Sequence, residues 1–137
     1  MNMYTVAVKR HFVAQHYLLG DDWGEENRKH SHHYLVELQV KGSKLDKHGY
    51  LLDIMDIQSY LDEQVHYYKD KTLNDLPEFM GLNPSIECFA FILCKKFSQK
   101  INAPAANIIA VKIWESDNVW ASYTSVKYDD HDAKFEL

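Results

Sequence analysis

Apolar and polar residues alternate in two stretches near the start of the chain, a pattern typical of strands that bury one face. The first stretch runs from Tyr4 to His16 and the second from about His30 to Val40. The polar segment from Leu19 to Lys29 contains glycines and acidic residues and is predicted to be the loop between them. The two stretches therefore predict neighbouring strands joined by a long connection.

Helical spacing of apolar residues follows in the middle of the chain. A short strand is expected from Tyr50 to Ile54, and Asp56 is the expected N-cap of a first helix that ends near Tyr68. Residues 69–83 show no regular pattern. A second helix is expected to begin near Asn83-Pro84-Ser85, because proline is tolerated in a first helical turn. Its apolar positions are Ile86, Phe89, Ala90, Leu93, Phe97 and Ile101.

Two further alternating stretches close the pattern, from Ile109 to Glu115 and from Trp120 to Val126, before a charged tail at 127–137 that we expect to be loosely held. Strands grouped at both ends of a chain around two helices favour an α+β fold with an antiparallel sheet and helices on one face. Without repeats or linkers, residues 1–137 are expected to form a single domain with a core at about 4–126.

Composition narrows the classes of function. The chain has 137 residues and a formal net charge of −5, which argues against nucleic-acid binding, because phosphate contacts need clustered basic residues. No run reaches the roughly 18 apolar residues of a membrane helix, so no membrane partner is expected. Cys88 and Cys94 lie about 9 Å apart along one predicted helix, too far for a mutual disulfide. With no signal peptide visible, these features indicate a reduced, cytoplasmic protein.

The histidines are the candidate chemistry. His30 and His32 are two residues apart in a predicted strand, so both side chains leave the same, otherwise apolar face. His16 closes the first strand on the face that carries Phe12 and Ala14. If the two strands pair, the three imidazoles can converge as the three protein ligands of a catalytic zinc. The alternative is a polar strand end, the role expected for His33 on the opposite face.

A series of short motifs runs through the chain in a fixed order: Phe12-Val13-Ala14-Gln15-His16, His30-Ser31-His32-His33-Tyr34, Gly49-Tyr50-Leu51-Leu52-Asp53, Leu73-Asn74, Asn83-Pro84-Ser85-Ile86-Glu87 and Val111-Lys112-Ile113-Trp114-Glu115. The series resembles the 6-pyruvoyl tetrahydropterin synthase and 6-carboxytetrahydropterin synthase family over roughly residues 4–126. The resemblance implies the T-fold, a four-stranded antiparallel sheet with two helices on one face. It also implies a barrel-forming hexamer, a dimer of trimers, with active sites between subunits.

The same resemblance implies a zinc ion (Zn2+) on His16, His30 and His32 that binds the side chain of a reduced pterin. It further implies that Glu115 holds the pterin ring, for which a carboxylate suits the ring's N–H groups. A polar strand end is the alternative for Glu115. An acid that continues a row of buried apolar residues is costly without a partner, which favours the binding role.

The catalytic residues of the family are changed here. Glu26 stands at the position of its catalytic Cys, and Lys69 and Asp70 replace its proton-relaying Asp-His pair. A related branch with Glu at the Cys position cleaves the pterin side chain in an aldolase-like step. We therefore predict a zinc-dependent lyase with Glu26 as base and Asp70, with His66, returning a proton. The alternative for Glu26 is a solvated acid in a loop, and that for Asp70 is a solvated, salt-bridging turn. Two other functions stay open: a synthase with a rebuilt triad, and a non-catalytic zinc- and pterin-binding oligomer.

Overall fold

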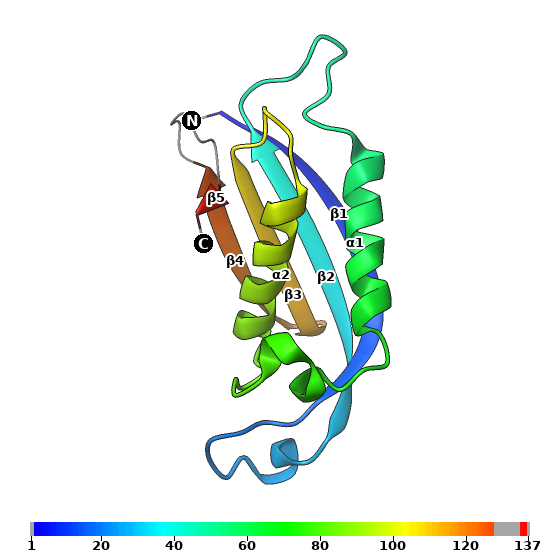
Figure 1. The fold of residues 1–137 in the computed structure, drawn as a ribbon, viewed down its shortest axis with the longest axis vertical. Helices are drawn as coiled ribbons and strands as arrows, with labels where there is room; N and C mark the ends of the chain where they lie inside the picture. Colours follow the sequence, from blue (N-terminus) through cyan, green and yellow to red (C-terminus); the bar gives the residue numbers. More distant parts are fainter. Residues whose placement is uncertain (1, 128–134, 137) are drawn as a thin grey trace.

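The computed structural model describes residues 2–127 and 135–136 (Figure 1). Its sheet is antiparallel throughout and follows the order β1-β2-β3-β4-β5. The strands are β1 (Tyr4–His16), β2 (His30–Gly42), β3 (Ile108–Ser116), β4 (Val119–Lys127) and β5 (Phe135–Glu136). The expected four strands are thus present. The two-residue β5 adds a fifth at the edge, where it pairs with the end of β4, so this part of the expected loose tail joins the sheet.

Both helices lie on the same face of the sheet, as the α+β prediction requires. α1 (Ile54–Tyr68) packs over β1, and α2 (Ile86–Lys100) packs over β3 and β4 (Figure 1). Alternation along the strands turns an apolar face toward the helices, and helical spacing turns an apolar stripe toward the sheet. The aromatic side chains of Phe12, Tyr34 and Phe89 meet between the two layers, with ring centroids 5.4 to 6.0 Å apart.

The segment before α1 departs from the prediction. The expected strand at 50–54 does not form, because the Asp46 carboxylate accepts N–H groups from His48 and Tyr50 and folds the segment into a turn. The helix then begins three residues earlier than expected. Asp53, not Asp56, is its N-cap, with an extended backbone and a carboxylate that accepts the Met55 N–H at 2.9 Å.

The connection between the helices is irregular, as expected, but contains two short 3₁₀ helices, η2 (Leu73–Asp75) and η3 (Pro77–Phe79). Ser85 caps α2, and its side chain accepts the Cys88 N–H. Cys88 and Cys94 are both free thiols, in agreement with the sequence. Within the described part of the chain, no helix combines the length and apolarity that crossing a membrane requires.

One end of the sheet extends past the helices. The paired ends of β1 and β2 reach below α1 and α2, and the loop between these strands hangs from that end (Figure 1). The connection between α1 and α2 lies against the helix-facing side of this overhang, where His16 is buried and contacts Pro84, while His30 and His32 are half-buried.

Candidate metal centre

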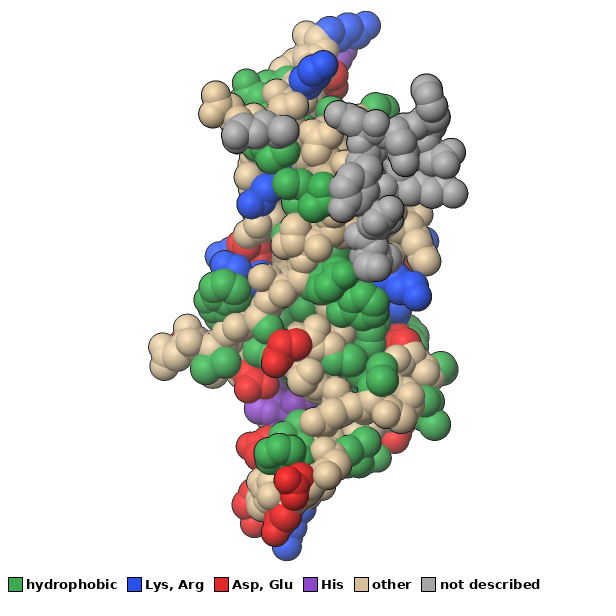
Figure 2. All heavy atoms as spheres, turned by 90° about the vertical axis from the view of Figure 1, so that its left-hand side faces the viewer, with side chains coloured by type: hydrophobic (Ala, Val, Ile, Leu, Met, Phe, Trp, Pro, Cys, Tyr) green, Lys and Arg blue, Asp and Glu red, His purple; other side chains and the backbone are tan. Residues whose placement is uncertain are grey.

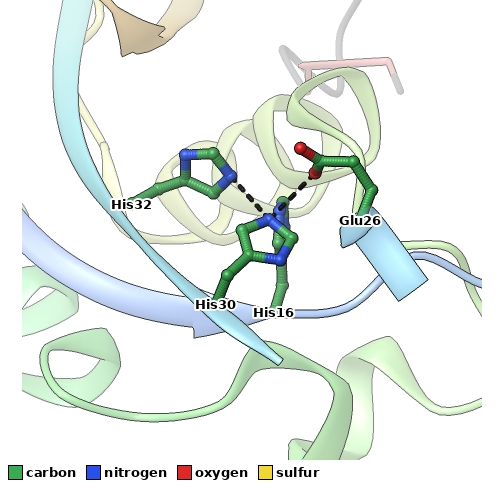
Figure 3. A group of neighbouring side chains, drawn as sticks. All are labelled: His16, Glu26, His30 and His32. Atoms are coloured by element: carbon green, nitrogen blue, oxygen red, sulfur yellow. Dashed lines mark hydrogen bonds and ion pairs between the residues drawn. The ribbon is translucent and has the colours of Figure 1, made fainter. Parts of the chain in front are cut away.

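Three histidine side chains meet at the overhanging end of the sheet. The register pairs His16 with His30 and Ala14 with His32, so all three imidazoles leave the helix-facing side of two neighbouring strands. Their ring centroids lie 4.6 to 4.7 Å from one another (Figure 3). The convergence that alternation and strand pairing predicted is present in the structure.

His16 is held in the form that binds a metal. Its side chain is only 2% exposed, and its Nδ1 lies 3.1 Å from the Pro84 carbonyl oxygen and 3.2 Å from the Tyr34 hydroxyl. Since a carbonyl only accepts, Nδ1 carries the proton and Nε2 carries the lone pair. Burial, with the nearby imidazoles of His32 and His30, lowers the pKa of His16 to about 4. The ring is therefore neutral at physiological pH.

The Nε2 atom of His16 is buried and has no hydrogen-bond partner among the described residues. An unpaired buried lone pair is costly unless something in the native protein satisfies it. A metal ion placed among the three imidazoles would satisfy it.

His30 shows the same arrangement on the other strand. Its Nδ1 lies 2.7 Å from the Arg28 carbonyl oxygen, which fixes the proton on that nitrogen. Its Nε2 points inward, 2.9 Å from Nε2 of His32 and 3.0 Å from Oε2 of Glu26. Histidine ligands of metals usually donate their other N–H to a carbonyl or carboxylate. Backbone carbonyls hold both His16 and His30 in this way.

Glu26 comes from the short 3₁₀ helix η1 (Gly24–Asn27) in the loop between β1 and β2. Its carboxylate points at the imidazoles (Figure 3), and one ligand atom from each of the four residues lies within 4.8 Å of the others. Among the described residues this is the one such group. On the face viewed from the β4 side, histidine side chains reach the surface between acidic ones (Figure 2). Three imidazoles with a carboxylate are a donor set that zinc accepts.

Three asparagines hold the loop that carries Glu26 in place. The sequence pattern did not predict this role for them. Asn27 is the hub inside the loop: it accepts the Trp23 N–H and donates to the carbonyls of Leu18 and Asp21. Asn74 makes a two-way pair with the backbone of Tyr17, next to His16, and Asn83 accepts the Leu19 N–H. Asn74 and Asn83 belong to the motifs Leu73-Asn74 and Asn83-Pro84-Ser85-Ile86-Glu87, but the motifs themselves do not indicate that these side chains hold a loop.

Asp70 and His66 lie outside the histidine group. Asp70 adopts a positive φ of 61° just after α1, and its backbone N–H donates to the Val13 carbonyl at 2.7 Å. Its side chain is exposed and makes no hydrogen bond or ion pair with the described residues. His66 is exposed on the last turn of α1. The single chain therefore brings Glu26, but not these two residues, to the candidate metal centre.

Glu115 is half-buried near the end of β3 and also lies outside the group. It lines a surface pocket of about 540 Å³ together with Lys9, Trp114 and Asp117, among others. It also acts on the candidate centre from a distance. Burial first, and then the charges of Glu115 and Glu26, raise the pKa of Tyr34 above its usual value. The Tyr34 hydroxyl, which contacts His16, is thus within the electrostatic reach of both acids.

A half-buried polar network supports the segment that leads to Pro84. Glu78 accepts hydrogen bonds from Lys96 and Tyr68 at 2.7 Å and from Tyr67 at 3.0 Å. These residues lie on η3, α1 and α2, so the network ties both helices to the connection between them. Periodicity gave no sign of it, because its polar members are far apart in the sequence.

The fold and the site together define a class: an α+β protein with an antiparallel sheet, two helices on one face and a histidine-rich centre at the sheet's end. Residues 5–126 match the model of the family described as 6-pyruvoyl tetrahydropterin synthase. A 6-pyruvoyl tetrahydrobiopterin synthase of Dictyostelium discoideum is 28% identical over 123 residues, which cover 82% of this chain and 89% of that protein.

Solved structures agree with this result. The 6-pyruvoyl tetrahydropterin synthase of Caenorhabditis elegans matches with a TM-score of 0.78 at 20% identity, covering 90% of this chain and 96% of that one. A Plasmodium vivax 6-pyruvoyltetrahydropterin synthase with a catalytic glutamate replaced by cysteine matches with a TM-score of 0.75 at 15% identity, covering 92% and 99%. The chain belongs to the 6-pyruvoyl tetrahydropterin synthase family, a family of pterin-processing enzymes, and has its T-fold.

Proposed function

We propose that this chain is a zinc-dependent enzyme that cleaves the C6 side chain of a reduced pterin in a lyase or aldolase-like step. The observation that carries the proposal is the Glu26 carboxylate, 3.0 Å from Nε2 of His30 within the three-histidine group. His16, His30 and His32 would hold the zinc. When bound, the ion supplies Lewis-acid polarisation of a side-chain oxygen.

Glu26 is the proposed general base. It lies where a side-chain hydroxyl of the pterin would meet the histidine group, and a carboxylate at that point can accept the hydroxyl proton. Breakage of the adjacent carbon–carbon bond then leaves a carbon that needs a proton in return. A glutamate is also named a catalytic residue in the Plasmodium vivax enzyme, which supports the assignment.

Asp70, with His66, is proposed to return that proton from a neighbouring subunit. The exposed carboxylate of Asp70 has no partner among the described residues of its own chain, and the backbone holds it in a fixed left-handed conformation. The proposal therefore includes a closed homo-oligomer, a hexamer built as a dimer of trimers. Light scattering is expected to give about six times 16.1 kDa, and a monomer mass at micromolar concentration would contradict it.

Glu115 is the proposed anchor of the pterin ring. Its carboxylate stands near the end of a strand whose preceding residues on the same face, Ile113 and Val111, are buried. Two parallel hydrogen bonds from ring N–H groups to one carboxylate give both affinity and orientation.

The test is turnover of dihydroneopterin and of its triphosphate by the zinc-loaded protein, followed by product fluorescence. We expect 6-hydroxymethyl-dihydropterin, and a loss of about 10²- to 10⁴-fold in rate in Glu26→Gln. Glu25→Gln is the matched control, because Glu25 is exposed and pairs only with Arg28. A synthase product would instead favour the rebuilt triad. Binding without product from wild type would favour the non-catalytic oligomer.

A further inference from the structure

The Glu26 side chain has a single use in the described structure. Its carboxylate makes one close contact among the described residues, with Nε2 of His30, although the side chain is 54% exposed and could extend into solvent. Its neighbour Glu25, at 88% exposure, takes that outward course. The Glu26 carboxylate turns back toward three imidazoles, one of which has a buried nitrogen without a partner among the described residues. This is the position expected of a metal ligand.

The distances agree with shared coordination. Two ligand atoms that each lie about 2.0–2.1 Å from one zinc, at angles of about 90–110°, are separated by roughly 2.9–3.4 Å. Two separations in the group fall in this range: 2.9 Å between the Nε2 atoms of His30 and His32, and 3.0 Å between His30 Nε2 and Glu26 Oε2. Glu26 therefore lies where a fourth protein ligand would lie.

From this geometry we infer that Glu26 is the fourth protein ligand of the resting metal centre and leaves it when the pterin side chain enters. The inference rests on the proposed function, since it assigns to the proposed base a second task at the same site. The carboxylate fills the open position in the empty enzyme, and it becomes available to accept the substrate's proton only after exchange.

The surroundings single out Glu26 as the ligand that exchanges. His16 is buried, and backbone carbonyls hold both His16 and His30. Glu26 is on the solvent side, and within the part of the chain that the structure describes only His30 contacts its carboxylate. Asn27 fixes the backbone of the loop through the Trp23 N–H and two carbonyls. The side chain can therefore leave the centre by rotation while the loop stays in place.

The first test measures zinc affinity by competition with a chelator, without any turnover. We expect Glu26→Gln to weaken zinc binding by at least the factor of about 10 to 100 that loss of an outer hydrogen-bond partner costs. Glu25→Gln, at the neighbouring exposed position, should bind zinc as wild type does. Glu26→Asp, which keeps the charge but shortens its reach, should fall between them. Equal affinity in wild type and all three variants would overturn the inference.

The second test follows the exchange itself in the Co²⁺-substituted protein, whose visible absorption spectrum reports the ligand set. Without pterin, the spectra of wild type and Glu26→Gln should differ, and that of Glu25→Gln should match wild type. With saturating dihydroneopterin, the spectra of wild type and Glu26→Gln should converge. A difference that persists, or a wild-type spectrum that dihydroneopterin leaves unchanged, overturns the exchange. If both tests succeed and no pterin is cleaved, the ligand assignment stands and the proposed lyase activity fails.

Discussion

The network around Glu78 allows a prediction that depends on pH. Burial alone would raise the pKa of Glu78, but hydrogen bonds and charge from Lys96, together with its own backbone N–H and the Tyr68 hydroxyl, lower it from 4.5 to about 2. Such a shift corresponds to about 3.4 kcal/mol at most, at 1.36 kcal/mol per pKa unit. The side chains of Glu78 and Lys96 are 20% and 28% exposed, so we expect solvent to reduce this to about 2–3 kcal/mol.

The perturbation is Glu78→Gln, which keeps the shape of the side chain and removes its charge. A depressed pKa in the folded state gives stability that is fully present above pH 4.5 and is lost as the pH falls toward 2. The variant should therefore unfold about 2–3 kcal/mol more easily than wild type at pH 7, and by less than half of that difference at pH 3.

Urea unfolding at fixed protein concentration measures both differences. Glu63→Gln is the control, since its pair with Lys100 spans 3.6 Å between side chains that are more than half exposed, and should change stability by less than about 0.5 kcal/mol. A Glu78→Gln variant within 0.5 kcal/mol of wild type at pH 7, on the order of an exposed pair, would refute the reasoning. So would a difference that is the same at pH 3 and pH 7.

Three further predictions concern the site. His32→Ala should lose stoichiometric zinc in elemental analysis while His33→Ala keeps it, because His33 faces away and pairs with His11; full zinc in the first variant would contradict the assignment. Asp70→Asn should keep thermal stability, since Asn tolerates the positive φ, yet lose about 10²-fold or more in rate; unchanged turnover would remove Asp70 from the mechanism. Glu115→Gln should raise the dissociation constant for dihydroneopterin before it lowers the rate of cleavage, and a pure rate defect would argue against an anchor.

Alternation was enough to predict much of the fold, because a buried strand face repeats every two residues. β1 was predicted over the bounds that the structure shows, and the shared face of His30 and His32 followed from the same rule. Local hydrogen bonding is where the reasoning failed. The Asp46 turn replaced the short strand before α1, and Asp53 rather than Asp56 became the cap. Each carboxylate accepts a nearby backbone N–H, and hydrophobic periodicity does not show which one will do so.

Hydrophobic periodicity could not predict contacts between residues that are distant in the sequence. His16 and the carbonyl that fixes its tautomer, Pro84, are 68 positions apart, and nothing in the periodicity of either segment links them. The Lys96–Glu78 pair is missed for the same reason. The proposed role of Glu115 came from the family resemblance, and those of Asp70 and His66 from their position where this chain departs from it. All three remain predictions.

The segment after α1 contacts the edge of β1 that does not pair with β2, and it covers only the end of that edge. The Lys71 carbonyl accepts the Gln15 N–H, and the Asp70 N–H donates to the Val13 carbonyl. The backbone groups at this end of the β1 edge are therefore already hydrogen-bonded. A strand from another chain that added to β1 would have to stop short of Val13 and lie along the earlier residues. Docking at this edge is therefore limited to the earlier part of β1, and an incoming strand would not run alongside His16 at the end of β1.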